Sequence, residues 1–258
     1  MVLPATGTQP EGDPRRRGGA QVVPRPAEAR PGQAPPWAAL DAAARQVDLA
    51  RIRQALAVGP ARPAPVEPAG GRAAAVLVAL WEEEGTAWVL LTRRAAHLRT
   101  HKGEVSFPGG GQDPGEAPVD TALREAEEEV GLAPVLVEVV GELDHLTTLS
   151  DSVSIVPVVG FLPGRPTQLS ANPDEVEQIL LVPLSELLLD EVFREEEWAF
   201  GGSSRSMHFF ELVGDTVWGA TARVLHQLLS LVLRSPTSDR RRSAGEQADQ
   251  DRGDDQPR

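Results

Sequence analysis

Three glutamates in the middle of the chain have the spacing of a site for a divalent cation. Residues 124–132 read REAEEEVGL, and four of these nine residues are acidic. In a helix Glu125, Glu128 and Glu129 stand at positions i, i+3 and i+4, so they lie on one face and repel one another. A hard cation such as Mg²⁺ removes this repulsion, because it is bound by carboxylates together with substrate phosphates and water. Without such a cation, a glutamate-rich helix face is usually a solvated surface.

The residues around these acids predict the helix that the spacing requires. Pro118 suits the first turn of a helix, and Gly131 suits the position just past its end. Between them, apolar residues recur at helical spacing and can face a core; they are Val119, Leu123, Ala126 and Val130. The sequence therefore predicts a helix over residues 118–130, with acids on one face and an apolar stripe on another.

The acids belong to a longer spaced pattern that begins in a run of glycines. The pattern consists of Gly110, five residues, Glu116, seven residues, Arg124-Glu125, a small apolar residue, any residue, Glu128-Glu129, any residue, Gly131 and the aliphatic Leu132. It resembles the Nudix box at every defined position. A pattern of this length is far more specific than a short glycine motif, so it favours a metal site over a solvated surface.

The resemblance implies a loop–helix–loop that binds Mg²⁺ or Mn²⁺ and hydrolyses a nucleoside diphosphate linked to another moiety. It assigns catalytic roles to Arg124, Glu125, Glu128 and Glu129. The metal ligands that it implies are the same three glutamates, the carbonyl of Gly109, and Glu116 as a further acid beside the metal. Arg124 would hold a carboxylate in place. The glycines at 109–111 can adopt backbone angles closed to other residues, so the loop can approach a ligand closely.

A second motif lies immediately upstream and narrows the expected substrate. It runs Leu90-Leu91-Thr92, any residue, Arg94, Ala95, three residues, Arg99, three residues, Gly103, three residues and Phe107-Pro108-Gly109-Gly110. It is similar at every position to the signature of one Nudix branch, the coenzyme A diphosphatases. Together with the VWGATARVL stretch at 217–225, the resemblance covers roughly residues 36–234.

This second resemblance implies cleavage of the diphosphate of coenzyme A and its thioesters. The products would be 4′-phosphopantetheine, or its acyl form, and adenosine 3′,5′-bisphosphate. The substrate-binding residues that it implies are Arg94, Arg99 and Gly110; an arginine suits phosphate because its planar fork is always charged and binds in a bidentate way. Two alternatives stay open. One is hydrolysis of ADP-ribose, NADH or a dinucleoside polyphosphate, and the other is a module that senses a nucleotide without turnover.

Two further groups of residues are left outside the expected site. His97 and His101 stand at positions i and i+4, but no third ligand accompanies them, so surface or phosphate-facing roles are favoured over zinc binding. Glu175 follows a loop and could act as an extra acid on the metal-bound water. A capping role in that loop accounts for Glu175 equally well.

The composition of the chain limits the classes of protein and of partner. With 258 residues, 41% of them hydrophobic, the chain fits one folded domain with tails. Its net charge of −13 argues against a general nucleic-acid binder, whose footprint is a basic surface. The lack of cysteine excludes disulfides and cysteine-bound zinc. No apolar run approaches about 20 residues and no signal peptide is evident, so we expect a cytoplasmic protein without a membrane partner. We expect it to act on a small-molecule substrate, and the sequence is compatible with a homodimer.

The hydrophobic pattern predicts an α/β domain between two tails. Residues 1–35 and 235–258 are expected to be disordered, and residues 36–234 are expected to form the domain. Strands are predicted at 73–81, 87–94, 104–107, within 135–148, and at 153–161, 179–182, 193–200 and 207–213. Helices are predicted at 37–58, 118–130, 183–189 and 218–233. These elements suggest a mixed sheet with helices on both faces, and the resemblance implies the Nudix α/β/α sandwich.

Overall fold

Within the part of the chain that the structure describes, the larger of two sheets has eight strands. They are β2 (Arg72–Glu83), β3 (Thr86–Arg94), β4 (Val105–Ser106), β5 (Gly109–Gly111), β6 (Glu138–Glu142), β7 (Leu146–Thr147), β8 (Val153–Phe161) and β9 (Val176–Pro183). The main path runs β4-β3-β2-β8-β6, while β5 pairs with β2, β7 with β8 and β9 with β3. Since β2 and β8 are parallel and the other pairs among these strands are antiparallel, the sheet is mixed, as predicted.

The computed structural model describes residues 17–64, 71–148, 153–200 and 203–234. Residues 1–16 of the first expected tail and the whole of the second, residues 235–258, therefore lie outside the described residues.

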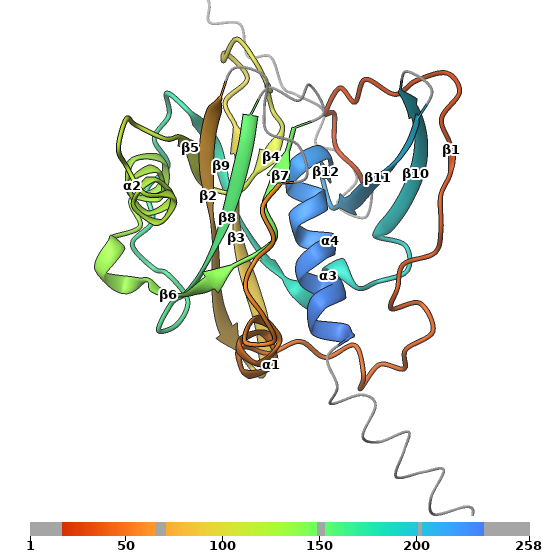
Figure 1. Cartoon of the computed structure of the whole chain (residues 1–258), viewed down its shortest axis with the longest axis horizontal. Coiled ribbons are helices and arrows are strands. Elements are labelled where there is room, and N and C mark those ends of the chain that lie inside the picture. The colour runs from red at the N-terminus through yellow and green to blue at the C-terminus, as the bar shows by residue number, and fades with distance from the viewer. Residues whose placement is uncertain (1–16, 65–70, 149–152, 201–202, 235–258) are drawn as a thin grey trace, which may run out of the picture.

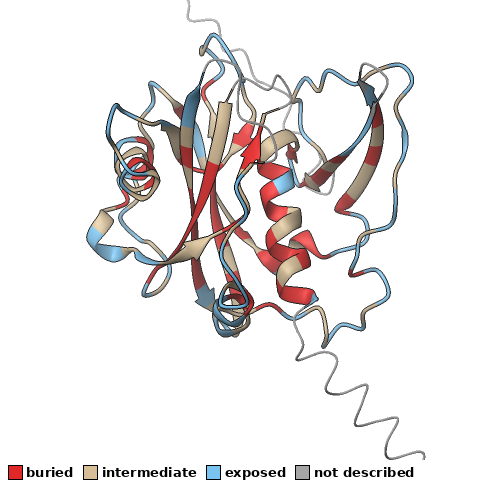
Figure 2. Ribbon diagram, viewed as in Figure 1, coloured by how far each residue is buried: buried red, intermediate tan, exposed pale blue. Residues whose placement is uncertain are grey.

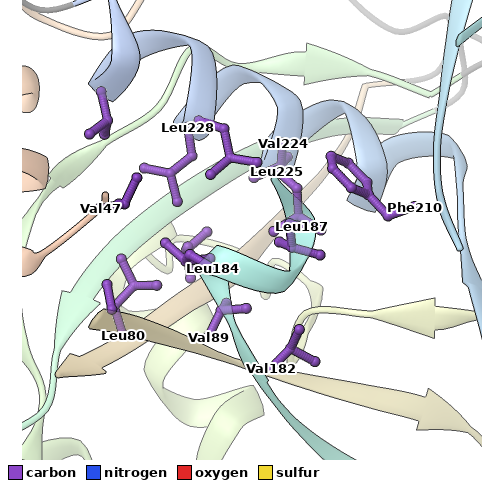
Figure 3. Packing of buried hydrophobic residues seen from close by; sticks show 14 of the residues in the cluster. Val47, Leu80, Val89, Val182, Leu184, Leu187, Phe210, Val224, Leu225 and Leu228 are labelled. Carbon is purple, nitrogen blue, oxygen red and sulfur yellow. The ribbon is translucent and has the colours of Figure 1, made fainter. Parts of the chain in front are cut away.

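Helices cover both faces of the larger sheet (Figure 1). They are α1 (Leu49–Leu56), α2 (Pro118–Val130), α3 (Leu184–Leu187) and α4 (Gly219–Leu233), with a short 3-10 helix at Pro134–Leu136. One face packs on α2, and the other packs on α1, α3 and α4. Figure 3 shows Leu184 and Leu187 of α3 lying between α4 and the sheet. The predicted α/β fold with helices on both faces is thus confirmed. None of the helices in the described ranges is long and apolar enough to span a membrane.

A smaller sheet lies on the far side of α4 (Figure 1). Its strands follow the order β1 (Arg30–Pro31), β10 (Phe193–Phe200), β11 (Ser203–Leu212) and β12 (Asp215–Val217). Side chains alternate across β11: Phe210 joins the core around α4, whereas Met207 and Phe209 face the other way. Because α4 is enclosed between two sheets, it is buried around most of its circumference (Figure 2).

The N-terminal strap, residues 17–31, covers the outer face of the smaller sheet. Val23 and Ala29 pack against Met207, Phe209 and the buried Trp198. The strap is also tied through its backbone, since β1 pairs with β10 and the N–H of residue 18 donates to the carbonyl of residue 212 at 2.7 Å. Part of the segment whose composition predicts a disordered tail therefore lies along the domain. An extended strap needs no apolar periodicity, because isolated apolar residues and backbone pairing hold it.

The helix predicted at 37–58 is much shorter in the structure. Only α1 is helical, and it begins after Asp48, whose side chain accepts a hydrogen bond from the N–H of Arg51 at 2.8 Å. Such an N-cap marks a helix start. Upstream, the guanidinium of Arg45 donates to the carbonyls of residues 38, 40 and 188, and Trp37 is completely buried. The segment before α1 is thus a set of turns around Arg45. The apolar residues whose spacing predicted a helix pack individually from these turns instead of forming one helical face.

Most predicted strands appear. Pro157 favours an edge or a bulge, yet β8 lies inside the sheet, paired with β2 on one side and with β6 and β7 on the other. The gap between β6 and β7 falls at Pro157, where only its carbonyl is used, accepting from the N–H of Leu143 at 3.0 Å. The sequence did not predict β1, β5 or β12, which are at most three residues long.

Candidate functional site

The helix α2 has the ends that its sequence predicts. It begins at Pro118, after Ala117, whose side chain makes no capping hydrogen bond. Gly131 follows the helix in the left-handed conformation, with φ of 69°, and its N–H donates to the carbonyl of Glu127 at 2.9 Å. Glycine adopts this backbone without steric cost. Since the apolar face of α2 packs on the larger sheet, the acids are directed away from that core, toward the loop that precedes the helix.

Two glycines bring that loop against the acids. Gly109 and Gly110 lie in β5, which pairs with β2. A Cβ at Gly110 would collide with the carboxylate of Glu125, and a Cβ at Gly109 would collide with the carbonyl of Ala75. The missing side chains therefore let the loop join the sheet and let Glu125 lie directly on the loop backbone.

Arg124 is the centre of the acidic cluster. Its guanidinium donates to the two oxygens of Glu116 at 2.9 and 3.1 Å, to Glu125 at 2.9 Å and to Glu128 at 3.2 Å. It also donates to the carbonyl of Gly111 at 3.2 Å. One side chain thus joins the loop to three of the expected site acids.

Glu116 is held from several sides. Besides Arg124, the hydroxyl of Thr121 donates to Glu116 at 2.7 Å, and the N–H of Asp113 donates at 3.1 Å. The bonds from Arg124, followed by those from Thr121 and Asp113, lower the pKa of Glu116 to about 2. Glu116 therefore stays ionised throughout the physiological pH range and keeps Arg124 beside the helix.

Glu129 has a different environment from the other acids of the box. Only 2% of its surface is exposed, and burial raises its pKa to about 8. The guanidinium of Arg94 lies 3.8 Å from its carboxylate and opposes this rise, while the charge of Glu175 adds to it. The N–H of Gly109 donates to Glu129 at 3.4 Å. Arg94, Gly109 and Glu129, which belong to two separate motifs, are thus neighbours in the fold.

The other arginines of the upstream motif lie elsewhere. Arg99 is exposed in residues 95–103, which we call the basic loop. The structure gives Arg99 no hydrogen bond or ion pair with a described residue, so it is not brought into the cluster. Arg93 points to the smaller sheet and forms a bidentate pair with Asp215 at 2.8 and 2.6 Å. His97 contacts the carbonyl of Asp174 at 3.1 Å, which holds the basic loop against the segment that precedes β9.

Glu175 is a residue that the sequence left outside the site and the structure places near it. Its charge raises the pKa of both Glu125 and Glu129. The loop that carries it is fixed to the end of α2, since the N–H of Asn172 donates to the carbonyl of Glu129 at 2.8 Å and the N–H of Ala95 donates to the carbonyl of Glu175 at 2.8 Å. The only signal in the sequence was an acid directly after an Asn-Pro-Asp turn, which is common in proteins.

The acids of the box have the chemistry of a divalent-cation site but do not converge on one point. Among the residues that the structure describes, no group of three or more acids or histidines is arranged to hold a metal ion. Glu125 and Glu128 turn to Arg124 instead. The donors nevertheless fit a hard cation, because they are carboxylate oxygens. Burial raises the pKa of Glu125 and Glu129, and a bound cation would offset the charge that burial disfavours.

A cavity of about 690 Å³ opens beside the loop that precedes α2. Its lining includes Arg72, Gly110, Gly111, Gln112, Asp113 and Glu116. The cavity therefore adjoins both the glycine backbone and the acid that Arg124 holds, and it offers room for a ligand larger than a metal ion.

Comparison with known proteins identifies relatives of this chain. The model of the NUDIX domain matches residues 71–200. Nudix hydrolase 22, chloroplastic, from Arabidopsis thaliana is 41% identical over 170 residues, which is 63% of this chain and 56% of that protein. The uncharacterized Nudix hydrolase NudL of Photorhabdus laumondii is 41% identical over 145 residues, which is 56% of this chain and 76% of that protein.

The chain spans just over half the length of the plant relatives, since it covers 59% of Nudix hydrolase 15, mitochondrial, from Arabidopsis thaliana at 39% identity. Among solved structures, a MutT/nudix family protein from Enterococcus faecalis superposes with a TM-score of 0.42 at 17% identity, over 64% of this chain and 63% of that one. The domain match and the bacterial relative show the family to which the chain belongs. The chain belongs to the NUDIX domain family.

Proposed function

We propose that this protein is a metal-dependent hydrolase that cleaves the diphosphate of coenzyme A and its thioesters. The observation that carries the proposal is the contact between two motifs: Arg94 of the upstream signature lies 3.8 Å from Glu129 of the box. An arginine beside acids that can hold a cation is suited to a substrate with several phosphates, since its fork binds phosphate oxygens in a bidentate way. The products are 4′-phosphopantetheine, or its acyl form, and adenosine 3′,5′-bisphosphate.

The proposed ligands of Mg²⁺ or Mn²⁺ are Glu125, Glu128, Glu129 and the carbonyl of Gly109, with Glu116 held beside them. When bound, the cation offsets charge on the diphosphate and lowers the pKa of the attacking water. Arg124 orients the carboxylates, because its guanidinium already donates to Glu116, Glu125 and Glu128. Gly110 is the proposed backbone contact with the substrate, because it lines the cavity beside the loop.

The base that takes a proton from the attacking water is one of the box glutamates or Glu175. Glu175 is partly exposed and its charge acts on both Glu125 and Glu129. It can therefore reach water near the cluster while the box acids are occupied with the cation. Proton acceptance by a positioned carboxylate contributes roughly 10²–10⁴-fold to the rate of many enzymes.

Substrate discrimination tests the assignment to coenzyme A. Arg94 and Arg99 are the proposed contacts for the phosphates, and a charge-assisted contact contributes about 1.5–3 kcal/mol. Loss of the 3′-phosphate should therefore lower kcat/KM by roughly one to two decades. Because that phosphate is remote from the scissile bond, the loss can fall entirely on KM.

The experiment is steady-state kinetics with Mg²⁺ on coenzyme A, its 3′-dephospho form, ADP-ribose, NADH and a dinucleoside polyphosphate, with the products identified by mass spectrometry. Arg99→Ala should reduce the preference for coenzyme A more than it reduces turnover of the dephospho form, which completes a double cycle. Equal kcat/KM for the two forms would remove the coenzyme A assignment and leave a hydrolase of another nucleoside diphosphate derivative. Tight nucleotide binding without turnover would favour a sensing module.

A further inference from the structure

Gln21 of the N-terminal strap joins three segments that are far apart in the sequence. Its side-chain amide nitrogen donates to the carbonyl of Gly103 at 3.0 Å and to the carboxylate of Asp215 at 2.8 Å. Its amide oxygen accepts from the N–H of Thr216 at 2.9 Å. The strap, the end of the basic loop and β12 therefore meet at one side chain.

The partners of Gln21 fix the orientation of its amide. Asp215 is 2% exposed and, paired with Arg93, accepts hydrogen bonds as a carboxylate, so the nitrogen of the amide must face it. The N–H of Thr216 can only donate, so the oxygen of the amide must face that group. The bond to Gly103 then follows from a side chain that has no alternative orientation.

The basic loop that Gln21 holds lies beside the acids of the box. The loop starts directly after Arg94, which faces Glu129, and its first N–H, from Ala95, donates to the carbonyl of Glu175 at 2.8 Å. At its other end, the N–H of Gly103 donates to the carbonyl of Arg94 at 3.1 Å. Between these two anchors, residues 99–102, which include Arg99, are exposed. At this second anchor Gln21 adds a side-chain contact from the strap, since its amide donates to the carbonyl of the same Gly103.

We propose that Gln21 is a positioning residue that holds the basic loop, and with it Arg99, in the place where a phosphate of the substrate is recognised. The inference rests on the proposed function. The strap thereby sets substrate discrimination, although it contacts neither Arg124 nor the glutamates of the box in the described structure. Without the hydrogen bond from Gln21, the end of the loop is less restrained and Arg99 samples more positions. Recognition of the phosphate that Arg99 contacts therefore weakens.

The first test is kinetic. Gln21→Met keeps the length of the side chain and removes its hydrogen bonds, and it should raise KM for coenzyme A about fivefold, the factor that one ordinary hydrogen bond provides, with kcat unchanged. KM for the 3′-dephospho form should change less. The matched control is Arg25→Ala, which removes a contact between the same strap and Glu196, at 2.7 Å, without touching the basic loop. Equal changes in KM for both substrates, or the same change in the control, would overturn the proposal.

The second test does not depend on activity. Arg99 and Lys102 are exposed trypsin sites in the basic loop, and cleavage of a native protein follows local opening. Gln21→Met should speed cleavage after these two residues about fivefold, as followed by mass spectrometry, while Arg25→Ala should not. If no substrate of the panel is hydrolysed, the proposed function fails, and accelerated cleavage still supports the hold on the loop. Unchanged cleavage overturns the proposal whatever the kinetics show.

Discussion

Two arginines of this protein, Arg93 and Arg124, each organise a set of carboxylates, but they do so in opposite ways. Arg93 gives its fork to a single buried acid, Asp215, which is 2% exposed. Arg124 divides its donors among three acids, from Glu125, whose side chain is 14% exposed, to Glu128, whose side chain is 57% exposed. A bidentate pair that ends on a buried acid is suited to supporting structure. A shared and partly exposed arginine can release a carboxylate to a cation and still hold the others.

The largest expected effect follows from changing one of the acids that share Arg124. In Glu128→Gln, kcat measured with Mg²⁺ should fall by about 10²–10³-fold, since metal ligands and electrostatic groups of this kind supply several kcal/mol at the transition state. Stability should hardly change, because exposed ion pairs contribute about 0–1 kcal/mol. Glu127→Gln on the same helix is the control, and it should leave kcat unaltered. A Glu125→Gln, Glu128→Gln double variant that kept near-native turnover in EDTA would contradict the assignment of the metal site.

The second expected effect follows from breaking the pair between Arg93 and the buried Asp215. Asp215→Asn should lower the free energy of unfolding by about 3 kcal/mol, because removing one partner of a buried pair leaves the other uncompensated. Urea unfolding measures this loss. Glu177→Gln is the matched control: Glu177 lies 3.6 Å from the same arginine but its side chain is 48% exposed, so the change should stay below about 1 kcal/mol. Equal losses in the two variants would show that burial does not distinguish the two kinds of pair.

The third effect concerns pH in the absence of metal. The pKa of Glu129 rises on folding from 4.5 to about 8, so between these values the native state binds more protons than the unfolded state and stability falls as pH rises. The slope is at most about 1.4 kcal/mol per pH unit. Burial lowers the pKa of His208 and His226 to about 4, which gives the opposite slope below pH 6.5. Between pH 6.5 and 8 the two histidines therefore no longer oppose the slope that Glu129 produces.

Urea unfolding in EDTA across that window should show stability decreasing with pH for the native sequence and a flatter profile for Glu129→Gln. Added Mg²⁺ should flatten the native profile as well, because a cation favours the ionised carboxylate. A native profile as flat as that of the variant would mean that Glu129 titrates normally.

The parts of the fold that the sequence predicted are those with local signals. Pro118 and Gly131 mark the ends of α2 because each acts through its own backbone angles, and both ends appear where expected. The acids between them have a fixed spacing on a helix, so their common face followed from the sequence. The long strands β2 and β3 were equally evident, since each is a continuous apolar run bounded by a turn.

The parts that the sequence missed depend on partners far along the chain. Nothing near Gln21 indicates that its amide will meet Asp215, which lies 194 residues away. Val23 and Ala29 form no periodic stripe, and they become part of a core only because the outer face of β11 needs cover. The position of Glu175 could not be predicted for the same reason, since its nearness to Glu129 arises from the attachment of its loop to the end of α2.

The smallest expected effect asks whether the Arg124 set depends on support from the buried side of the helix. Thr121 is completely buried and donates to Glu116 at 2.7 Å; Thr216, near the other arginine, is 6% exposed and donates to Glu211 at 2.6 Å. Thr121→Val and Thr216→Val each remove a hydroxyl that donates to a glutamate while keeping the shape of the side chain, so each should cost at least about 1 kcal/mol of stability in urea unfolding. Thr216→Val also removes the bond that the hydroxyl accepts from the N–H of Gly19 at 3.1 Å. Only Thr121→Val should also lower kcat, by about two- to fivefold, because Glu116 loses a partner that fixes Arg124 against the acids. If both variants lowered kcat alike, the loss would reflect general softening of the domain, and the two arginine sets would not differ in the way that their burial indicates.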